Sequence, residues 1–295
     1  MNVVLPHLPA LQVVIPLIAA PLCLLAGRAS LAWTIAFLAS ACATAAAAIL
    51  AYQTLHHGPI SYHMGGWAPP WGIEYAVDSA NAFILLLVSG IATVVLLYCP
   101  SSVSKEIRAG REHMFYCMFI LCLTGLLGIA ITGDAFNVFV FLEISSLSSY
   151  ALIAMGSQRK ALTASFQYLI MGTIGATFFL IGVGLLYMIT GTLNLADLQT
   201  RIPQIQDSRP LLAAFAFITV GLALKAALFP LHLWLPNAYA YAPSGVSAFM
   251  AATATKVSLY VLLRFTFTLF GVEFAFSELP LHWVLVVPAV IAMFA

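Results

Sequence analysis

Eight long apolar segments constrain this chain more than any other feature of its sequence. A bilayer core about 30 Å thick requires roughly 20 apolar helical residues to cross it. Eight segments between polar breaks have such a length: Leu8 to Leu25, Leu31 to Thr54, Val77 to Tyr98, His113 to Thr132, Ala135 to Met155, Ala161 to Ile189, Leu211 to Leu235 and Pro243 to Phe270. The sequence therefore predicts an all-α polytopic membrane protein with eight full transmembrane helices.

The composition excludes most other protein classes. Apolar residues make up 63% of the 295 residues and charged residues only 7%, whereas soluble domains have about 45–50% and about 25%. The net charge is +1 and no basic stripe is present, which excludes a nucleic-acid binder. The five cysteines lack metal or redox spacing, so we interpret them as small hydrophobic residues.

The two ends of the chain carry further expectations. A ninth apolar run starts at Leu281 and stops at Ala295, where helical geometry extends it only about 22 Å. We expect a truncated ninth helix and a natural protein that continues beyond it. The first span has no preceding basic residue and no small-residue cleavage pattern, so we expect an uncleaved helix rather than a signal peptide.

The distribution of lysine and arginine predicts the orientation, because cytoplasmic loops are enriched in these residues. With the N-terminus outside, the outer loops hold only Arg201 and Arg209. The inner loops then hold six basic residues: Arg28, Lys105, Arg108, Arg111, Arg159 and Lys160. The sequence therefore predicts a chain whose N-terminus faces outside.

The outer loop from His56 to Ala76 is rich in glycine and proline, which predicts a turn or a short hairpin on the helix ends. Its histidines His56, His57 and His63 have no acidic or cysteine partner at ligand spacing. We interpret them as solvated loop residues and expect no metal site.

Four glycines recur in the sixth span: Gly172, Gly175, Gly182 and Gly184. No strand precedes them, and they lie within a long apolar helix. They indicate close helix packing rather than a nucleotide-binding loop.

Three charged residues fall near the bilayer midplane: Glu143 in the fifth span, Lys225 in the seventh and Lys256 in the eighth. A charge at that depth costs at least roughly 2.5–3.5 kcal/mol, so it must face protein, water or a counter-ion. One interpretation is an ion pair that only joins two helices. However, one carboxylate neutralises only one of two lysines, which favours a functional role for the group.

A proton relay would use such a group directly. Desolvation disfavours an ammonium group, and a nearby carboxylate favours it. A lysine that moves between these surroundings would therefore load a proton beside Glu143 and release it on separation. This interpretation makes the lysine a switchable element of a pump.

The backbone after Lys225 supports the same interpretation. Pro230 cannot donate a hydrogen bond to the carbonyl of Ala226, which predicts a discontinuous seventh helix. Such breaks are tolerated in membranes where protein or a water-filled cavity satisfies the freed carbonyls. His232 lies between the two lysines, where it would either pass protons or bond those carbonyls; both interpretations remain open.

Polar residues in the eighth span recur at spacings of three, four and four, which predicts a stripe on one helical face: Thr253, Lys256, Tyr260 and Arg264. In an alternative, Arg264 reaches the headgroups and Thr253 bonds its own backbone. Four serines follow Glu143: Ser145, Ser146, Ser148 and Ser149. They would either hydrate the carboxylate or permit close helix packing, and the sequence does not separate these roles.

Three segments carry a resemblance to a known family. They are TGDAFNVFVFLEISSLSSYALIAMG (Thr132 to Gly156), YLIMGTIGATFFLIGVGLLYMITGTLNLADL (Tyr168 to Leu198) and LALKAALFPLHLWLPNAYAYAPSGVSAFMAATATKVSLYVLLR (Leu222 to Arg264). With GGWAPPWGIEYAVD (Gly65 to Asp78), they resemble the antiporter-like membrane subunits of respiratory complex I, membrane-bound hydrogenases and Mrp-type sodium/proton antiporters.

The resemblance implies roles for individual residues. Glu143, Lys225 and Lys256 match the family's proton half-channel, and His232 matches the histidine after the helix break. Asp134 matches an acidic position at the outer start of the fifth span. The sequence departs from the family pattern at three places: Gln167, Asn237 and the dipeptide Ser244-Gly245.

The resemblance also implies an inverted-repeat transporter. Residues 1–112 would hold the first three helices and the outer hairpin, residues 113–270 the first five-helix repeat, and residues 271–295 the start of a second repeat. Since relatives carry that second repeat in full, this chain is expected to be a fragment or half of a split subunit.

The implied function is a proton-translocating subunit of a multisubunit Na⁺/H⁺ antiporter, and the chain is most similar to the Mrp-type D subunit. The close alternative is a pumping subunit of an NADH:quinone oxidoreductase (complex I) or a membrane-bound hydrogenase. Either way we expect a transport subunit rather than an enzyme, in a bacterial plasma membrane. Its partners would be other membrane subunits, protons, Na⁺ in the antiporter, and the lipid bilayer. No haem, flavin or iron–sulfur ligand set is visible, so we expect no cofactor.

Two other classes fit less well. Gly133-Asp134 is faintly similar to aspartyl intramembrane proteases, but no second aspartate lies within a span to complete a dyad. A purely structural subunit remains an alternative.

Overall fold

The structure is a computed structural model that describes residues 5–278 and 281–294. The described residues are mostly helical, with one two-stranded sheet. The α-helices are α1 (Leu8–Ala26), α2 (Ala29–His57), α3 (Ser79–Glu106), α4 (Glu112–Ile131), α5 (Ala135–Ala154), α6 (Lys160–Thr190), α7 (Leu195–Arg201), α8 (Arg209–Lys225), α9 (Trp234–Tyr241), α10 (Ser244–Leu263) and α11 (Leu281–Ala292). The remaining elements are β1 (Ile60–His63), β2 (Glu74–Val77), the 3₁₀ turns η1 (Leu5–His7), η2 (Met64–Gly66) and η3 (Ile202–Gln204), and the π-helices η4 (Arg264–Phe270) and η5 (Phe274–Glu278).

Seven helical segments in the described residues are long and apolar enough to cross a membrane. They agree with seven of the eight predicted spans. The remaining one, the seventh span predicted over Leu211 to Leu235, is divided between the 17-residue α8 and the short α9. The ninth apolar run begins as α11, whose last described turn is followed by Ala295, which lies outside the described residues.

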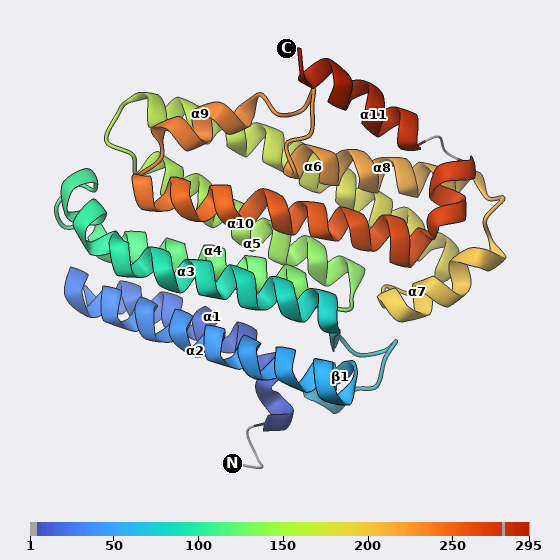
Figure 1. Ribbon diagram of the computed structural model, residues 1–295, viewed down its shortest axis with the longest axis horizontal. Coiled ribbons are helices and arrows are strands. Elements are labelled where there is room, and N and C mark those ends of the chain that lie inside the picture. Colours follow the sequence, from blue (N-terminus) through green and yellow to red (C-terminus); the bar gives the residue numbers. More distant parts are fainter. Residues whose placement is uncertain (1–4, 279–280, 295) are drawn as a thin grey trace.

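The long helices run side by side along the long axis of the molecule (Figure 1). The α3–α4 and α9–α10 connections lie at one end of this bundle, and α7 and the hairpin lie at the other. Helix α4 occupies the centre, where it packs against α1, α3, α5 and α10. About 83% of its most apolar 18-residue window is buried, against 39–44% in α1, α2, α3 and α6. An interior helix surrounded by helices with apolar outer faces is the arrangement expected in a bilayer.

The predicted hairpin is confirmed by an antiparallel pairing in which Ile60 faces Val77 and His63 faces Glu74. The hairpin is tied to the helix ends beneath it. The Gly133 N–H donates to the Glu74 carbonyl over 2.8 Å, and the Leu195 N–H donates to the Gly133 carbonyl over 2.8 Å. These bonds hold β2, the α4–α5 turn and the start of α7 together at one end of the bundle.

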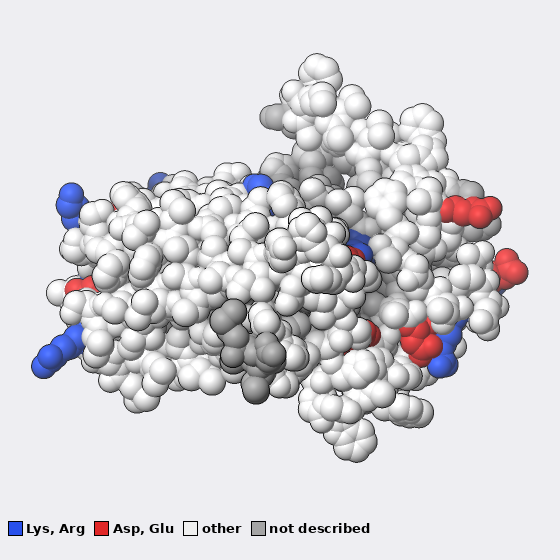
Figure 2. Space-filling view, turned by 60° about the horizontal axis from the view of Figure 1, so that its bottom comes forward, with Lys and Arg blue, Asp and Glu red and all other residues white. Residues whose placement is uncertain are grey.

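Most charged side chains lie at the two ends of the molecule. Figure 2 shows a face that is mostly uncharged along its length, with acidic and basic side chains gathered mainly at the two ends. The six basic residues predicted for the inner side lie at or near helix ends, around the α1–α2, α3–α4 and α5–α6 connections.

Three of the four glycines in the sixth span lie at close helix contacts, as predicted. A Cβ on Gly182 would lie 2.8 Å from the Ala214 carbonyl oxygen, and one on Gly175 would lie 3.1 Å from the Gly221 carbonyl oxygen. A Cβ on Gly172 would clash with the Tyr150 hydroxyl. Gly184 differs, because a Cβ there would meet nothing within 4 Å. The first two contacts bring α6 against α8, the helix that carries Lys225.

Candidate functional site

Helices α5 and α8 bring Glu143 and Lys225 together. The Lys225 Nζ lies 4.0 Å from the Glu143 Oε1, and the two side chains are 4% and 27% exposed. The same Nζ donates a hydrogen bond of 2.6 Å to the Ser146 Oγ. Glu143 and Ser146 are three residues apart on α5 and therefore share a face of that helix. The pair thus forms a loose ion pair with a hydroxyl beside it.

Helix α8 ends at Lys225, and the chain does not resume a helix until Trp234. Ala227 in this interval has a φ of 55°, a left-handed conformation that residues with a Cβ rarely adopt. The Trp234 indole Nε1 donates to the Leu224 carbonyl over 3.2 Å, and its ring stacks on Tyr168 at 4.0 Å. The tryptophan therefore bonds a carbonyl at the end of α8 that also accepts from the Ala227 N–H. Bonding the carbonyls at the break is one of the two roles that the sequence left open for His232.

The His232 ring lies 5.2 Å from the Phe229 ring, between centroids, within the same interval. Its Nδ1 is buried and makes no hydrogen bond to any described residue. The Glu143 Oε1 and the Tyr150 hydroxyl are likewise buried without a hydrogen-bond partner in the described part of the chain. Buried polar atoms normally have partners, so three groups near the α8–α9 break have hydrogen-bonding capacity that the described residues do not use.

Lys256 does not join this cluster. It lies on the exposed side of α10, and its Nζ donates to the Ala251 carbonyl on its own helix. The described ion pairs include none with Lys256. Thr253 on the same helix is buried and bonds the Phe249 carbonyl over 2.7 Å, which is the backbone bonding that the sequence allowed for it.

The four serines after Glu143 have different contacts. Ser146 accepts the hydrogen bond from the lysine, whereas the Ser145, Ser148 and Ser149 hydroxyls donate to backbone carbonyls of α5. The close packing expected of such serines is present as well, because a Cβ on Gly125 of α4 would lie 2.5 Å from the Ser145 nitrogen. The serines thus combine a polar contact at the ion pair with close helix packing.

Asp134 is the N-cap of α5, where its Oδ1 accepts from the Asn137 N–H over 2.7 Å. Burial raises the pKa of this carboxyl above its ordinary value, and the backbone N–H groups of Asn137 and Phe136 oppose that rise. Capping explains an acidic residue at this position.

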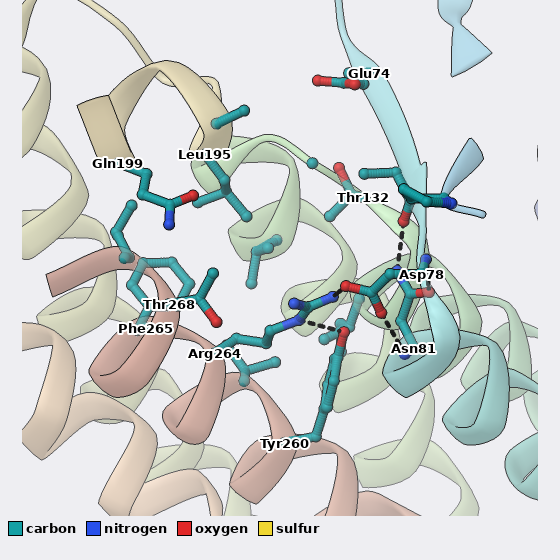
Figure 3. A pocket seen from close by; sticks show the side chains of 18 residues that line it. Glu74, Asp78, Asn81, Thr132, Leu195, Gln199, Tyr260, Arg264, Phe265 and Thr268 are labelled. Atoms are coloured by element: carbon teal, nitrogen blue, oxygen red, sulfur yellow. Dashed lines mark hydrogen bonds and ion pairs between the residues drawn. The ribbon is translucent and has the colours of Figure 1, made fainter. Parts of the chain in front are cut away.

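Tyr260 and Arg264 instead form a second polar group at the end of the bundle that holds α7 and the hairpin (Figure 3). The Arg264 guanidinium pairs with the Asp78 carboxylate, and its Nε donates to the Tyr260 hydroxyl over 2.9 Å. Arg264 is thus paired with a residue of this chain rather than reaching out to lipid headgroups. These three residues line a cavity of about 450 Å³.

Two residues in these contacts, Asp78 and Trp234, were not predicted as site residues from the sequence. Asp78 and Asn81 form a capping box at the start of α3, a signal visible in the sequence. That signal identifies the cap but not the partner Arg264, which lies 186 residues away. Trp234 carries no local signal for its bond to Leu224. Within the described residues, no three His, Cys, Asp or Glu side chains gather as metal ligands.

Comparison with known proteins gives consistent matches. Residues 132–295 match the protein family described as NADH:quinone oxidoreductase/Mrp antiporter, TM. The chain is 48% identical over 262 residues to the N subunit of the NADH-quinone oxidoreductase of Desulforudis audaxviator, covering 88% of this chain and 52% of that protein. It is 33% identical over 246 residues to the D subunit of the Na(+)/H(+) antiporter of Bacillus subtilis, covering 83% of this chain and 49% of that protein.

Solved structures resemble the fold as well. The membrane-bound sulfane sulfur reductase, an archaeal respiratory membrane complex, contains a chain with a TM-score of 0.84 and 30% identity, covering 95% of this chain and 57% of that one. The Mrp complex from Dietzia contains one with a TM-score of 0.81 and 27% identity, covering 90% and 49%. The present chain spans about half the length of the curated relatives it matches.

Proposed function

The chain belongs to the NADH:quinone oxidoreductase/Mrp antiporter transmembrane family, and from this premise we propose that it is a proton-translocating subunit of a multisubunit membrane complex. Protons would move through Glu143, Lys225, His232 and Lys256. The observation that carries the proposal is the Glu143–Lys225 pair, held at 4.0 Å beside the end of α8.

The looseness of this pair suits proton transfer. At 4.0 Å the carboxylate favours the ammonium form without a direct hydrogen bond, so a small movement changes the proton affinity of the lysine. The buried Tyr150 hydroxyl and His232 Nδ1 make no hydrogen bonds to described residues. These atoms offer the next positions for a transferred proton.

The backbone around Lys225 would allow that movement. We propose that α8, residues 226–233 and α9 cross the membrane together as a discontinuous seventh helix, broken at Pro230. Helices α4 to α10 would form the first repeat, within residues 113–270, and α11 would begin a second. Lys256 would join the relay when its exposed face is covered by other parts of the complex. Asp134, Thr253, Tyr260 and Arg264 would serve as accessory residues.

The driving force distinguishes two candidate functions. As an antiporter subunit, the protein would exchange protons for Na⁺ in a bacterial plasma membrane, with its N-terminus outside. As a subunit of an NADH:quinone oxidoreductase or a hydrogenase, it would pump protons with energy from a redox partner. The 48% identity to an oxidoreductase N subunit, against 33% to an antiporter D subunit, favours the second candidate, although the sequence segments themselves suggested the first.

A vesicle experiment tests the relay and separates the two candidates. Inverted vesicles from an antiporter-deficient host, expressing the complete operon, would carry a preset pH gradient. Sodium-dependent dissipation that is lost in Glu143→Ala and Lys225→Ala would establish the antiporter. Proton pumping only on addition of an electron donor, lost in the same variants, would establish the redox-driven pump.

The control is Arg28→Ala, which changes an exposed charge between α1 and α2 and is expected to leave transport unchanged. Loss of assembly in the Glu143 and Lys225 variants would instead support an ion pair that only joins two helices. Unchanged transport in both variants, with the complex assembled, would contradict the relay.

A further inference from the structure

The cavity at the outer end of the bundle is not part of the relay described above. It lies where β2, α7 and the outer ends of α3, α4, α5 and α10 meet, and its volume is about 450 Å³. Figure 3 shows Tyr260 of α10 and Arg264, the first residue of η4, reaching towards Asp78 at the start of α3. The charged pair therefore spans the cavity between two helices that are distant in sequence.

The lining of the cavity changes with depth. The charged residues and most of the polar residues of the lining lie near the helix ends, among them Glu74, Asp78 and Thr132. One turn or more towards the middle of the bundle the lining is apolar and tightly buried. Ile129, Val138 and Val261 line this part, and each is at most 2% exposed. A polar mouth above a dry apolar floor is the form of a gated aqueous access route.

The floor stops close to the relay. Val138 lies five residues before Glu143 on α5, and Tyr260 lies four residues after Lys256 on α10. At 1.5 Å per residue, about 7.5 Å and about 6 Å of helix separate the cavity from these two relay residues. Both helices therefore lead from the cavity to a proton-binding group within two turns.

The Asp78–Arg264 pair is held from both sides. The Asp78 Oδ1 accepts from the N–H groups of Ala80 and Asn81, which leaves Oδ2 for the guanidinium. Arg264 is the first residue of the π-helix η4, which also supplies Phe265 to the lining. Wide π-helical turns are rare and frequently occur at functional sites.

We propose that this cavity is an outer aqueous vestibule of the proton path and that the Asp78–Arg264 pair is its gate. The proposal rests on the proposed function, because it assigns the outer access to the same relay. Separation of the pair would let water pass Tyr260 and reach the apolar floor above Glu143 and Lys256. With the pair closed, the floor stays dry and the relay is isolated from the outer side.

The occupants of the vestibule are water and protons rather than a bare metal cation. Both carboxylates in the lining already accept hydrogen bonds. Glu74 accepts from the side chains of Ser61 and Asn194. Asp78 accepts from a backbone N–H group at the start of α3 and from Arg264. A bare cation would have to displace these donors. Water needs only the hydroxyl and amide groups of the mouth.

Cysteine accessibility tests the vestibule without measuring transport. In the whole complex, with the exposed Cys42 replaced by Ser, single cysteines would be placed at Gln199 in the mouth and Val261 in the floor. The probe is a membrane-impermeant cationic methanethiosulfonate, added to right-side-out and to inverted vesicles. Leu147→Cys, on the exposed apolar side of α5, is the matched control for a lipid-facing position.

We expect Gln199→Cys to react only from the outer side and Leu147→Cys to stay unreactive. Val261→Cys should react slowly with the pair intact, and at least tenfold faster when Asp78→Asn is added. Asparagine also caps helices, so this change breaks the pair and keeps the start of α3. Arg264→Gln is the second variant, and it should give the same acceleration.

Three results would overturn the proposal. They are an unreactive Gln199→Cys, labelling from inverted vesicles only, and a Val261→Cys rate that neither Asp78→Asn nor Arg264→Gln increases. Any of these labelling results, together with loss of transport in Glu143→Ala, rejects the vestibule but does not contradict the relay. Gated labelling together with unchanged transport in Glu143→Ala rejects the relay instead.

Discussion

Two ion pairs in this molecule, Asp78–Arg264 and Glu143–Lys225, are built in opposite ways. In the Asp78–Arg264 pair, Asp78 also accepts from backbone N–H groups as the N-cap of α3 and Arg264 also donates to the Tyr260 hydroxyl, so both partners have further bonds. In the inner pair the charges stand 4.0 Å apart, and the Glu143 Oε1 lacks a hydrogen bond within the described residues. A charge that accepts or donates several hydrogen bonds is suited to keep its ionised form, whereas a loosely held charge is suited to change its protonation.

The largest expected contrast between the two pairs is in transport. Lys225→Met removes the group that binds the proton, so proton movement should fall by about 10²-fold or more, as for the loss of an acid–base group. Arg264→Gln removes no proton-binding group of the relay, and its effect should be much smaller. The measurement is the initial rate of proton movement in vesicles with equal amounts of assembled complex. An equal loss of proton movement in the two variants would contradict the assignment of proton binding to the inner pair alone.

The close packing of α6 against α8, which positions Lys225 of the inner pair, provides the second test. Gly182→Ala places a Cβ 2.5 Å from the Ile218 side chain and 2.8 Å from a backbone oxygen of α8, the helix that carries Lys225. Overpacking of this kind costs about 1–3 kcal/mol, measured as a lower free energy of unfolding in detergent. Gly184→Ala is the matched control, because nothing lies within 4 Å of its Cβ. It should be neutral or slightly stabilising, and a similar loss in both variants would contradict the packing argument.

Double-mutant cycles measure the two pairs directly. For Asp78→Asn with Arg264→Gln we expect a coupling free energy of about 1–2 kcal/mol, because the partners are in direct contact. For Glu143→Gln with Lys225→Met we expect about 0.5 kcal/mol, because the charges are 4.0 Å apart and share no direct hydrogen bond. Thermal unfolding of the purified complex checks both values. A larger coupling for the inner pair would reverse the comparison.

The smallest effect is expected at a third ion pair of the described residues, Asp197–Arg201 on α7. The hydrogen bond from Arg201 holds the pKa of the Asp197 carboxyl below its ordinary value. The pair should therefore stabilise the protein at neutral pH and lose that contribution as the pH falls below about 4. Asp197→Asn should cost only about 0.3–0.5 kcal/mol at pH 7, and the difference from the wild type should vanish near pH 3. A difference that persists at pH 3 would exclude the ion pair as its cause.

The membrane class and most of the spans could be predicted from the sequence because they depend on local properties. Apolar runs of bilayer length identify helices whatever their neighbours are, and Pro230 marks a break because it lacks an N–H. The same reasoning isolated Glu143 and Lys225, since a charge in an apolar run is costly wherever the run packs. The hairpin between α2 and α3 followed in the same way from clustered glycine and proline.

Contacts between distant segments could not be predicted, because they depend on tertiary packing. A helical face gives the spacing of Tyr260 and Arg264 but not their partner, and only the packing of α3 beside α10 brings Asp78 to them. The fold also leaves Lys256 exposed and places Trp234, rather than His232, on the carbonyl of Leu224. The order of residues was enough to identify which side chains must avoid lipid. Which of them meet depends on how the helices pack against one another, because that packing is set by contacts summed over the whole bundle.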